Sequence, residues 1–154
     1  MKEKKTAREK LESIKANIVE IPPRMQGKYG EGRMLIPKPL DIDALIRSVP
    51  SGRLITYNRI REVLAERAGV EVTCPMTTGI FVSLCAKAAE EDRAEGKEDI
   101  TPYWRVVKED GRLNEKFPGG AKAQAKRLEE EGHRIEKAKG KKPPRVKDYE
   151  KWLV

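Results

Sequence analysis

A chain of 154 residues with a formal charge of +8 is long enough for one domain with a core and too short for two. Charged residues make up 38% and aromatic residues 5%, so the core is expected to be small and mostly aliphatic. Two cysteines are too few for a disulfide framework, nothing resembles a signal peptide, and no apolar run approaches the ~20 residues of a membrane span. These features predict a cytoplasmic protein, and plentiful Glu, Lys and Arg favour a thermophile.

The positive charge is concentrated at the two ends of the chain. Residues 34–132 hold 16 Lys+Arg against 17 Asp+Glu, whereas residues 1–33 hold 9 against 5 and residues 133–154 hold 8 against 3. Basic ends supply sequence-independent contacts to nucleic-acid phosphates. Solvated ends that only aid solubility have the same composition, so charge alone leaves both interpretations open.

Residues 1–19 are predicted to form an amphipathic helix, because three apolar residues recur at helical spacing: Leu11, Ile14 and Ile18. The prolines at 22–23 end this helix, and the glycines that follow indicate a flexible link as far as about residue 35.

Three further helices are predicted in the middle of the chain. Asp41 suits the N-cap of a helix over 42–49, and Thr56 and Gly69 suit the two caps of a helix over 57–68. A third helix begins at about Pro75 and continues toward Glu91. It runs through Ile80, Leu84 and Ala88.

A short strand is predicted at 104–107, followed by a turn at 109–112 and a return segment from Leu113, which together form a hairpin. A last helix is predicted at 121–131. The stretch Lys139-Gly140-Lys141-Lys142-Pro143-Pro144 is too polar and proline-rich for a core. Near the end of the chain, three apolar residues are able to dock: Tyr149, Trp152 and Leu153.

Three helices followed by a strand pair is the order of a winged helix-turn-helix, in which the third helix is the candidate DNA reader and the hairpin the wing. The predicted fold is therefore mainly α with a small β-hairpin. The predicted organisation is a basic N-terminal helix and linker at 1–33, a winged-helix domain at 34–133 and a basic tail at 134–154. Short helices with a hairpin also describe domains that bind no nucleic acid.

Three motifs carry a resemblance to a known family: Val-Pro-Ser-Gly-Arg-Leu-Ile-Thr-Tyr at 49–57, Thr-Pro-Tyr-Trp-Arg-Val-Val at 101–107 and Phe-Pro-Gly-Gly at 117–120. In content and order they resemble the DNA-binding catalytic domain of alkylguanine-DNA alkyltransferases, over about residues 34–133. That family has Pro-Cys-His-Arg-Val at its active site. Here Tyr103 stands at the Cys position and Trp104 at the His position.

Neither replacement supports alkyl transfer, because a phenol with a pKa near ~10 is a poor nucleophile at neutral pH and indole has no basic nitrogen. The chain is therefore similar to the noncatalytic alkyltransferase-like proteins, which bind alkylated DNA without repairing it. That similarity implies a monomer that binds double-stranded DNA, recognises or flags damaged bases for DNA-repair proteins, and uses no cofactor or metal. Those proteins usually keep the His and an arginine finger, both of which this chain lacks.

The resemblance also implies DNA-contacting residues. Tyr57 matches a tyrosine that contacts the phosphate at the target nucleotide, and the nearby Arg53 adds a cation. Thr78 takes the place of the arginine finger, and Gly79 permits close approach of a backbone. Phe81 is either a core residue, the preferred interpretation, or a wedge between bases. The remaining DNA-binding candidate is Arg105, whose family counterpart is mainly structural.

A vestigial alkylguanine pocket is predicted around Tyr103 and Trp104, together with Phe117, Pro118 and Glu131. Phe117 and Pro118 match an aromatic residue and a serine that line that pocket in the family. Glu131 matches the glutamate that supports the catalytic histidine. Without a histidine to orient, Glu131 is expected to be a surface charge at the end of a helix.

Two other classes of function stay open. The near-neutral middle segment favours a protein-interaction or regulatory domain that reuses the fold without strong DNA binding. An enzyme with displaced chemistry has only Cys74 in its favour, at a probable helix N-terminus that would lower a thiol pKa. The only histidine, His133, is far from Cys74 in sequence, and Cys85 is expected to be buried and inert.

Overall fold

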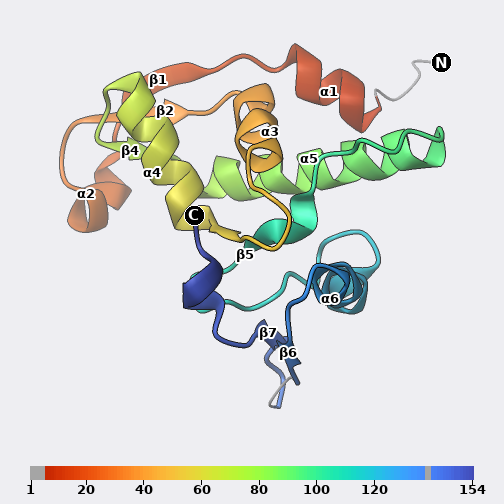
Figure 1. Cartoon of the computed structure of the whole chain (residues 1–154). Helices are drawn as coiled ribbons and strands as arrows, with labels where there is room; N and C mark the ends of the chain where they lie inside the picture. Colours follow the sequence, from red (N-terminus) through yellow and green to blue (C-terminus); the bar gives the residue numbers. More distant parts are fainter. Residues whose placement is uncertain (1–5, 138–139) are drawn as a thin grey trace.

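The computed structural model describes residues 6–137 and 140–154, and it is mainly helical with three small sheets (Figure 1). In chain order the elements are α1 (Ala7–Ser13), β1 (Asn17–Glu20), α2 (Pro23–Tyr29), β2 (Arg33–Ile36), α3 (Pro39–Arg47), β3 (Ile55–Thr56), α4 (Tyr57–Ala68), β4 (Val72–Thr73), α5 (Pro75–Ala94), β5 (Val106–Val107), α6 (Gly120–Glu130), β6 (Ile135–Glu136) and β7 (Arg145–Val146), with short 3₁₀ helices at Tyr103–Arg105 and Tyr149–Trp152. The predicted fold class is confirmed.

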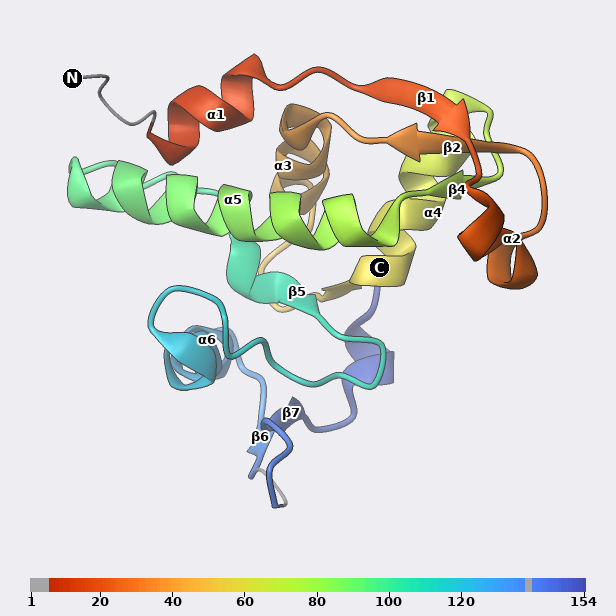
Figure 2. The ribbon, with the colours of Figure 1, turned by 180° about the vertical axis from the view of Figure 1, so that it is seen from behind.

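Helix α5 runs through the middle of the molecule, with α1 and the three-stranded sheet on one side and α6 with β6 and β7 on the other (Figures 1 and 2). Small side chains let neighbouring elements approach it closely, since Ala86, Ala88 and Ala89 are all fully buried. The main core also includes Leu11 of α1 and Val146 of β7. Segments on both sides of the predicted boundaries at 34 and 133 therefore contribute to one core.

The N-terminal segment differs from the predicted single helix. Helix α1 ends at Ser13, and Ile18 lies in β1 with 44% of its surface exposed. The flexible link predicted after Pro22 instead forms α2 and β2. The sheet order is β1-β2-β4, with β2 antiparallel to β1 and parallel to β4. Residues 1–5 of the predicted helix lie outside the described residues.

Helix α1 is held against α5 by charge as well as by Leu11. The Glu91 carboxylate accepts hydrogen bonds from the backbone N–H groups of Ala7 (3.0 Å) and Arg8 (3.1 Å), at the end of α1 where unpaired N–H groups attract an anion. The Arg8 guanidinium also pairs with Asp92 at 2.6 Å. These long-range contacts fix α1 over the C-terminal half of α5.

Helix α4 confirms the predicted caps, since the Thr56 hydroxyl accepts from the Arg59 N–H at 3.1 Å and Gly69 adopts a left-handed conformation. The prediction for α3 was wrong by three residues at its start. Lys38 is the N-cap and Pro39 occupies the first turn, so Asp41 lies inside the first turn. Helix α5 confirms the predicted start at Pro75 and extends three residues beyond Glu91.

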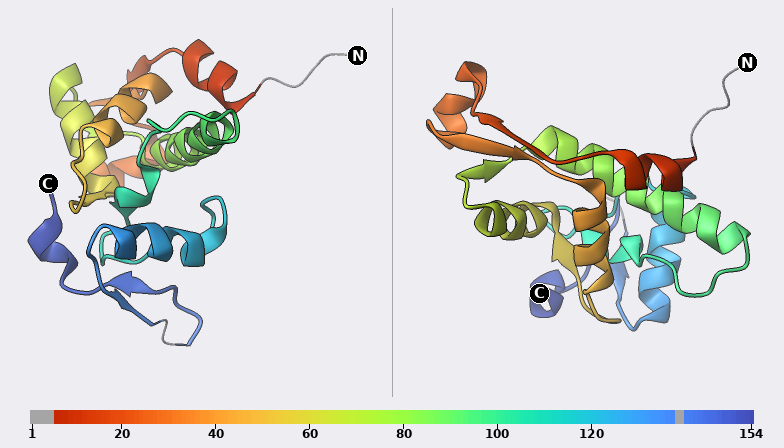
Figure 3. Two further views of the ribbon diagram at one scale, coloured as in Figure 1. Left: turned by 45° about the vertical axis from the view of Figure 1, so that its right-hand side comes forward. Right: turned by 90° about the horizontal axis from the view of Figure 1, so that it is seen from above.

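The hairpin predicted at 104–113 is absent from the described residues, because Tyr103–Arg105 forms a 3₁₀ helix and β5 pairs in parallel with β3. The antiparallel pair after the helices is instead β6 with β7, which projects from the body below α6 (Figure 3). The last predicted helix is confirmed as α6. No helix in the described ranges is long and apolar enough to cross a membrane.

The end of the chain docks as predicted. The backbone N–H of Leu54 donates to the Trp152 carbonyl at 2.8 Å, and the N–H of Val154 donates back to the Leu54 carbonyl at 2.9 Å. Tyr149 packs against the core over Gly111, where an added Cβ would lie 2.5 Å from the tyrosine ring. The left-handed φ of +81° at Gly111 is a second reason for glycine there.

Candidate nucleic-acid interface

One face of α5 exposes large apolar side chains to solvent. Met76 is 70% exposed and Ile80 is 59% exposed, which is unusual for large apolar side chains on a central helix. Gly79 lies between them, and a Cβ added there would meet nothing within 4 Å. Apolar residues lie on all sides of α5, so sequence spacing alone did not select its buried side.

The candidate arginine-finger position proves to be internal. Thr78 is fully buried, and its hydroxyl donates to the Cys74 carbonyl one turn earlier at 2.7 Å. Thr78 therefore does not reach the surface, and the prediction that it contacts DNA was wrong. Phe81 is 8% exposed and belongs to the main core, which confirms the preferred interpretation over a wedge between bases.

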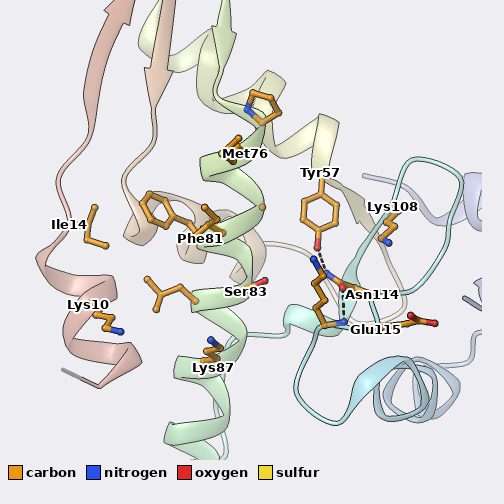
Figure 4. A pocket seen from close by; sticks show the side chains of 15 residues that line it. Lys10, Ile14, Tyr57, Met76, Phe81, Ser83, Lys87, Lys108, Asn114 and Glu115 are labelled. Carbon is orange, nitrogen blue, oxygen red and sulfur yellow. Dashed lines mark hydrogen bonds between the residues drawn. The ribbon is translucent and has the colours of Figure 1, made fainter. Parts of the chain in front are cut away.

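An open groove of about 790 Å³ follows this exposed face (Figure 4). Helix α1 contributes Lys10 and Ile14 on one side of α5. The start of α4 contributes Tyr57 on the other side, together with the loop that follows β5. The remaining lining residues are Pro75, Met76, Gly79, Ile80, Phe81, Ser83, Leu84, Lys87, Lys108, Asn114, Glu115 and Lys116.

The groove is positively charged. Lys10, Lys87, Lys108 and Lys116 line it from three elements, and Glu115 is the one acidic residue in the lining. Within the described residues, none of these four lysines forms an ion pair. Unneutralised cations on two sides of an apolar helix face suit a polyanion with a hydrophobic interior, which is the chemistry of a nucleic-acid duplex.

Tyr57 lies at the wall of this groove with its phenol oriented toward Asn114 (Figure 4). The phenol oxygen accepts a hydrogen bond from Asn114 Nδ2 at 2.8 Å, which leaves its own proton available to donate. Burial raises the pKa of Tyr57 to about 12, and the bond from Asn114 offsets only part of that rise. The phenol is therefore protonated at neutral pH and can donate to a phosphate oxygen.

Arg53 is occupied by the end of the chain. Its guanidinium donates to the carbonyl oxygens of Trp152 at 3.0 Å and Leu153 at 2.9 Å. These bonds give Arg53 a structural role in docking the C-terminal segment. It does not line the groove on α5.

The predicted vestigial pocket is filled by its own aromatic side chains. Tyr103 packs edge-on against Trp104 and Phe117, with ring centroids 5.4 and 5.3 Å apart. The three rings are only 4%, 7% and 2% exposed, so they form core. Outside them, Pro118 and Tyr103 border a separate hollow of about 510 Å³, whose cations are Arg93, Lys126 and Arg127.

Glu131 is the centre of a hydrogen-bond network, so the prediction of a surface charge was wrong. Its carboxylate accepts from the Trp104 indole at 2.9 Å, from the Arg105 guanidinium at 2.7 Å and from the Gly52 N–H at 3.2 Å. Burial opposes ionisation, but these donors outweigh it and hold the pKa of Glu131 below its usual value. Arg105 also donates to the Val49 carbonyl, so its contacts are structural.

The three side chains considered as nucleophiles, Tyr103, Cys74 and Cys85, are buried. The Tyr103 phenol donates to Glu90 at 2.8 Å, and burial together with that bond raises its pKa well above the ordinary value. Cys85 is buried with a raised pKa, caused first by burial and then by the nearby Asp43. Cys74 is also buried, and its sulfur accepts from the Thr77 hydroxyl. In the described part of the chain, no three His, Cys, Asp or Glu residues are placed to hold a metal.

The sequence interpretation thus found Tyr57 and Gly79 but missed most of the groove. Met76 and Ile80 were missed because apolar residues on a helix are usually core. The sequence contains a local indication for Asn114, since this residue closely follows the turn predicted at 109–112. No local pattern indicated Lys10, because its position beside α5 depends on the long-range contacts of Glu91.

The fold resembles that of a solved structure, although neither comparison of the sequence finds a relative. No protein-family model matches the chain, and no curated protein matches it. The crystal structure of S. pombe Atl1 in complex with damaged DNA containing O6-carboxymethylguanine matches with a TM-score of 0.51 and 19% sequence identity. The match covers 75% of this chain and 93% of that chain. The chain therefore has the fold of an alkyltransferase-like protein, as the order of its motifs predicted.

Proposed function

We propose that the protein is a noncatalytic DNA-binding protein that grips duplex DNA with the exposed face of α5. The observation that carries this proposal is the groove, in which Met76 and Ile80 are exposed between lysines from α1, α5 and the loop after β5. Phosphates would contact the lysines, and the apolar side chains would face the bases. The fold is shared with a protein crystallised in complex with damaged DNA, which supports DNA as the partner.

A further part of the proposal is that the protein flags alkylated bases for repair proteins without repairing them. Support for a noncatalytic role comes from Tyr103, whose buried phenol has a raised pKa and is bonded to Glu90. Tyr103, Trp104 and Phe117 pack against one another and are buried, so their own side chains occupy the predicted pocket. Any contact with an alkylated base is therefore assigned to the groove. The buried free thiols of Cys74 and Cys85 fit a reducing cytoplasm.

The test is a fluorescence-anisotropy titration of the intact protein with plain and O6-alkylguanine duplexes at two salt concentrations. Lys87→Glu combined with Lys108→Glu should raise Kd about tenfold or more, because two phosphate contacts become repulsive. Lys28→Glu combined with Arg67→Glu is the matched control, since both residues are exposed and lie away from the groove on α2 and α4. Equal losses of affinity for both pairs would mean that only overall charge matters.

A protein-interaction domain is the second candidate, and the exposure of Met76 and Ile80 is the observation that favours it. The two candidates differ in salt dependence. A phosphate-binding groove loses affinity steeply as salt rises, whereas an apolar protein interface does not. If the wild-type protein binds no duplex at low salt, the second candidate replaces the first.

A further inference from the structure

A second basic surface lies on the arm formed by β6, β7 and the turn between them, which we name the basic arm (residues 134–137 and 140–147). Its exposed cations are Arg134, Lys137, Lys141, Lys142 and Lys147. The one acidic residue of the arm, Glu136, is paired with Arg145 at 3.1 Å. Within the described residues, no ion pair involves the five exposed cations. The arm therefore presents unneutralised positive charge to solvent.

The arm is attached to the body by backbone hydrogen bonds. The Leu113 N–H donates to the Pro144 carbonyl and the Val146 N–H donates to the Gly111 carbonyl, both at 2.9 Å. The Arg112 guanidinium adds a bond of 2.9 Å to the Pro143 carbonyl. Val146 is fully buried in the main core. These bonds fix β7 and the residues before it along residues 111–113.

The residues on either side of the segment that holds the arm line the α5 groove. Residues 111–113 lie between Lys108 and Lys116, which both line the groove. The Lys108 N–H donates to the Arg112 carbonyl at 3.0 Å, and Asn114 bonds to Tyr57. The arm is thus joined directly to this side of the groove and projects beyond it, below α6 (Figures 2 and 3).

We propose that the basic arm is a second DNA-contacting surface, which engages the phosphate backbone of the duplex held in the α5 groove. This inference rests on the proposed function of that groove. In the described part of the arm no large apolar side chain is exposed, so the arm offers a partner only charge. A phosphate backbone is recognised by charge without base readout, and a duplex in the groove is the polyanion nearest to the arm.

The test compares two triple variants of the intact protein. Lys137→Gln, Lys141→Gln and Lys142→Gln remove three arm charges, while Arg24→Gln, Lys28→Gln and Arg67→Gln remove three exposed charges from α2 and α4. Affinity for a plain duplex is measured over a range of salt concentrations. The slope of log K against log salt should flatten by about 2 to 3 in the arm variant, at ~0.9 for each phosphate that is no longer neutralised, and stay unchanged in the control.

The outcomes separate this inference from the proposed function. If wild type binds the duplex but the arm variant keeps the control's slope, the arm makes no phosphate contacts and the inference is overturned. If wild type binds no duplex, the function assigned to the groove fails first. Competition by polyglutamate decides the partner. Unlabelled polyglutamate and unlabelled DNA are each added to the complex of the protein with labelled duplex. If polyglutamate removes the arm-dependent part of the binding as well as DNA does at an equal concentration of negative charges, the arm is assigned to acidic proteins instead.

Discussion

The indole N–H of Trp104 donates a hydrogen bond of 2.9 Å to the carboxylate of Glu131. In the resemblance to alkyltransferases, these two positions belong to the catalytic histidine and its supporting glutamate. The pairing between the positions is thus kept while the ring loses its basic nitrogen. Arg105 and Gly52 complete the set of donors, and the carboxylate side chain is 12% exposed. The contact between Trp104 and Glu131 is structural.

Replacing Trp104 by Phe removes the indole N–H and leaves a smaller ring at a buried site. Because the lost bond is to a charged carboxylate and the smaller ring leaves a cavity, the free energy of unfolding should fall by at least about 1.5–3 kcal/mol. Trp152→Phe is the matched control, since the Trp152 indole is 41% exposed and makes no hydrogen bond within the described residues. Urea unfolding measures both variants. Equal effects would mean that the Trp104–Glu131 bond contributes nothing beyond ring packing.

Glu131 also predicts a dependence of stability on pH. Its pKa in the folded protein is below the ordinary value of 4.5, so its stabilising effect is fully present above pH 4.5 and is lost as pH falls through the lower folded value. Glu131→Gln should therefore destabilise the protein most at pH 7. The difference between wild type and variant should shrink on acidification below about pH 4.5. A difference that is constant from pH 7 to pH 3 would contradict this account.

Tyr57→Phe should weaken duplex binding by about 1–3 kcal/mol, because the phenol loses a bond to a charged phosphate. The thermal midpoint should change little, since the ring remains. Tyr29→Phe is the control, because its phenol accepts a comparable bond from Arg61 at 3.2 Å outside the α5 groove. If Tyr57→Phe binds the duplex as tightly as wild type, the Tyr57 phenol makes no contact with phosphate and its bond with Asn114 is only structural.

Gly79→Ala separates stability from binding. Glycine in a helix interior costs about 0.5–1 kcal/mol relative to alanine, and the new Cβ meets nothing within 4 Å, so the variant should be more stable. The same methyl group stands on the face where DNA would approach closely, so affinity should fall. Gly27→Ala in α2 has the same open surroundings and should add stability without changing affinity. Undiminished affinity for Gly79→Ala would count against close approach at α5.

Incubation with O6-alkylguanine DNA should leave the mass of the protein unchanged. The Tyr103 phenol donates a hydrogen bond to Glu90 and has a raised pKa, and both cysteines are buried. Intact-protein mass spectrometry provides the measurement, with an active alkyltransferase as the positive control for the DNA. A stoichiometric adduct on Tyr103 or Cys74 would contradict a noncatalytic role.

Local signals in the sequence were sufficient for some elements and not for others. The caps of α4 are set by Thr56 and Gly69 within the helix itself, so the sequence predicted both ends. The strand β5 depends on parallel pairing with Ile55 and Thr56, about fifty residues earlier, and no local pattern indicates that partner. The end of α1 is another long-range effect, since β1 takes its place by pairing with β2.

The residues of the candidate site also differ in whether a local sequence signal or a long-range contact places them. Tyr57 was found because its motif is contiguous in sequence. Thr78 was assigned to the arginine-finger position by aligning the motif, and spacing gave no check on that assignment because apolar residues lie on several sides of α5. The near-neutral total of the middle segment concealed a basic groove, because all of its acidic residues except Glu115 lie outside the groove lining, and Lys10 joins the lining from outside that segment. Segment totals do not show where charges meet in space.

The central claim is that DNA binds on the exposed face of α5, and the methionines test it directly. The chain has four, of which Met76 is 70% exposed on that face, Met34 is 3% exposed in a separate cluster and Met25 lies in α2. With ¹³C-methyl methionine labelling, a duplex titration followed by NMR should shift or broaden the Met76 methyl signal and leave those of Met25 and Met34 in place. A titration that moves the Met25 signal while the Met76 signal stays unchanged would contradict the claim.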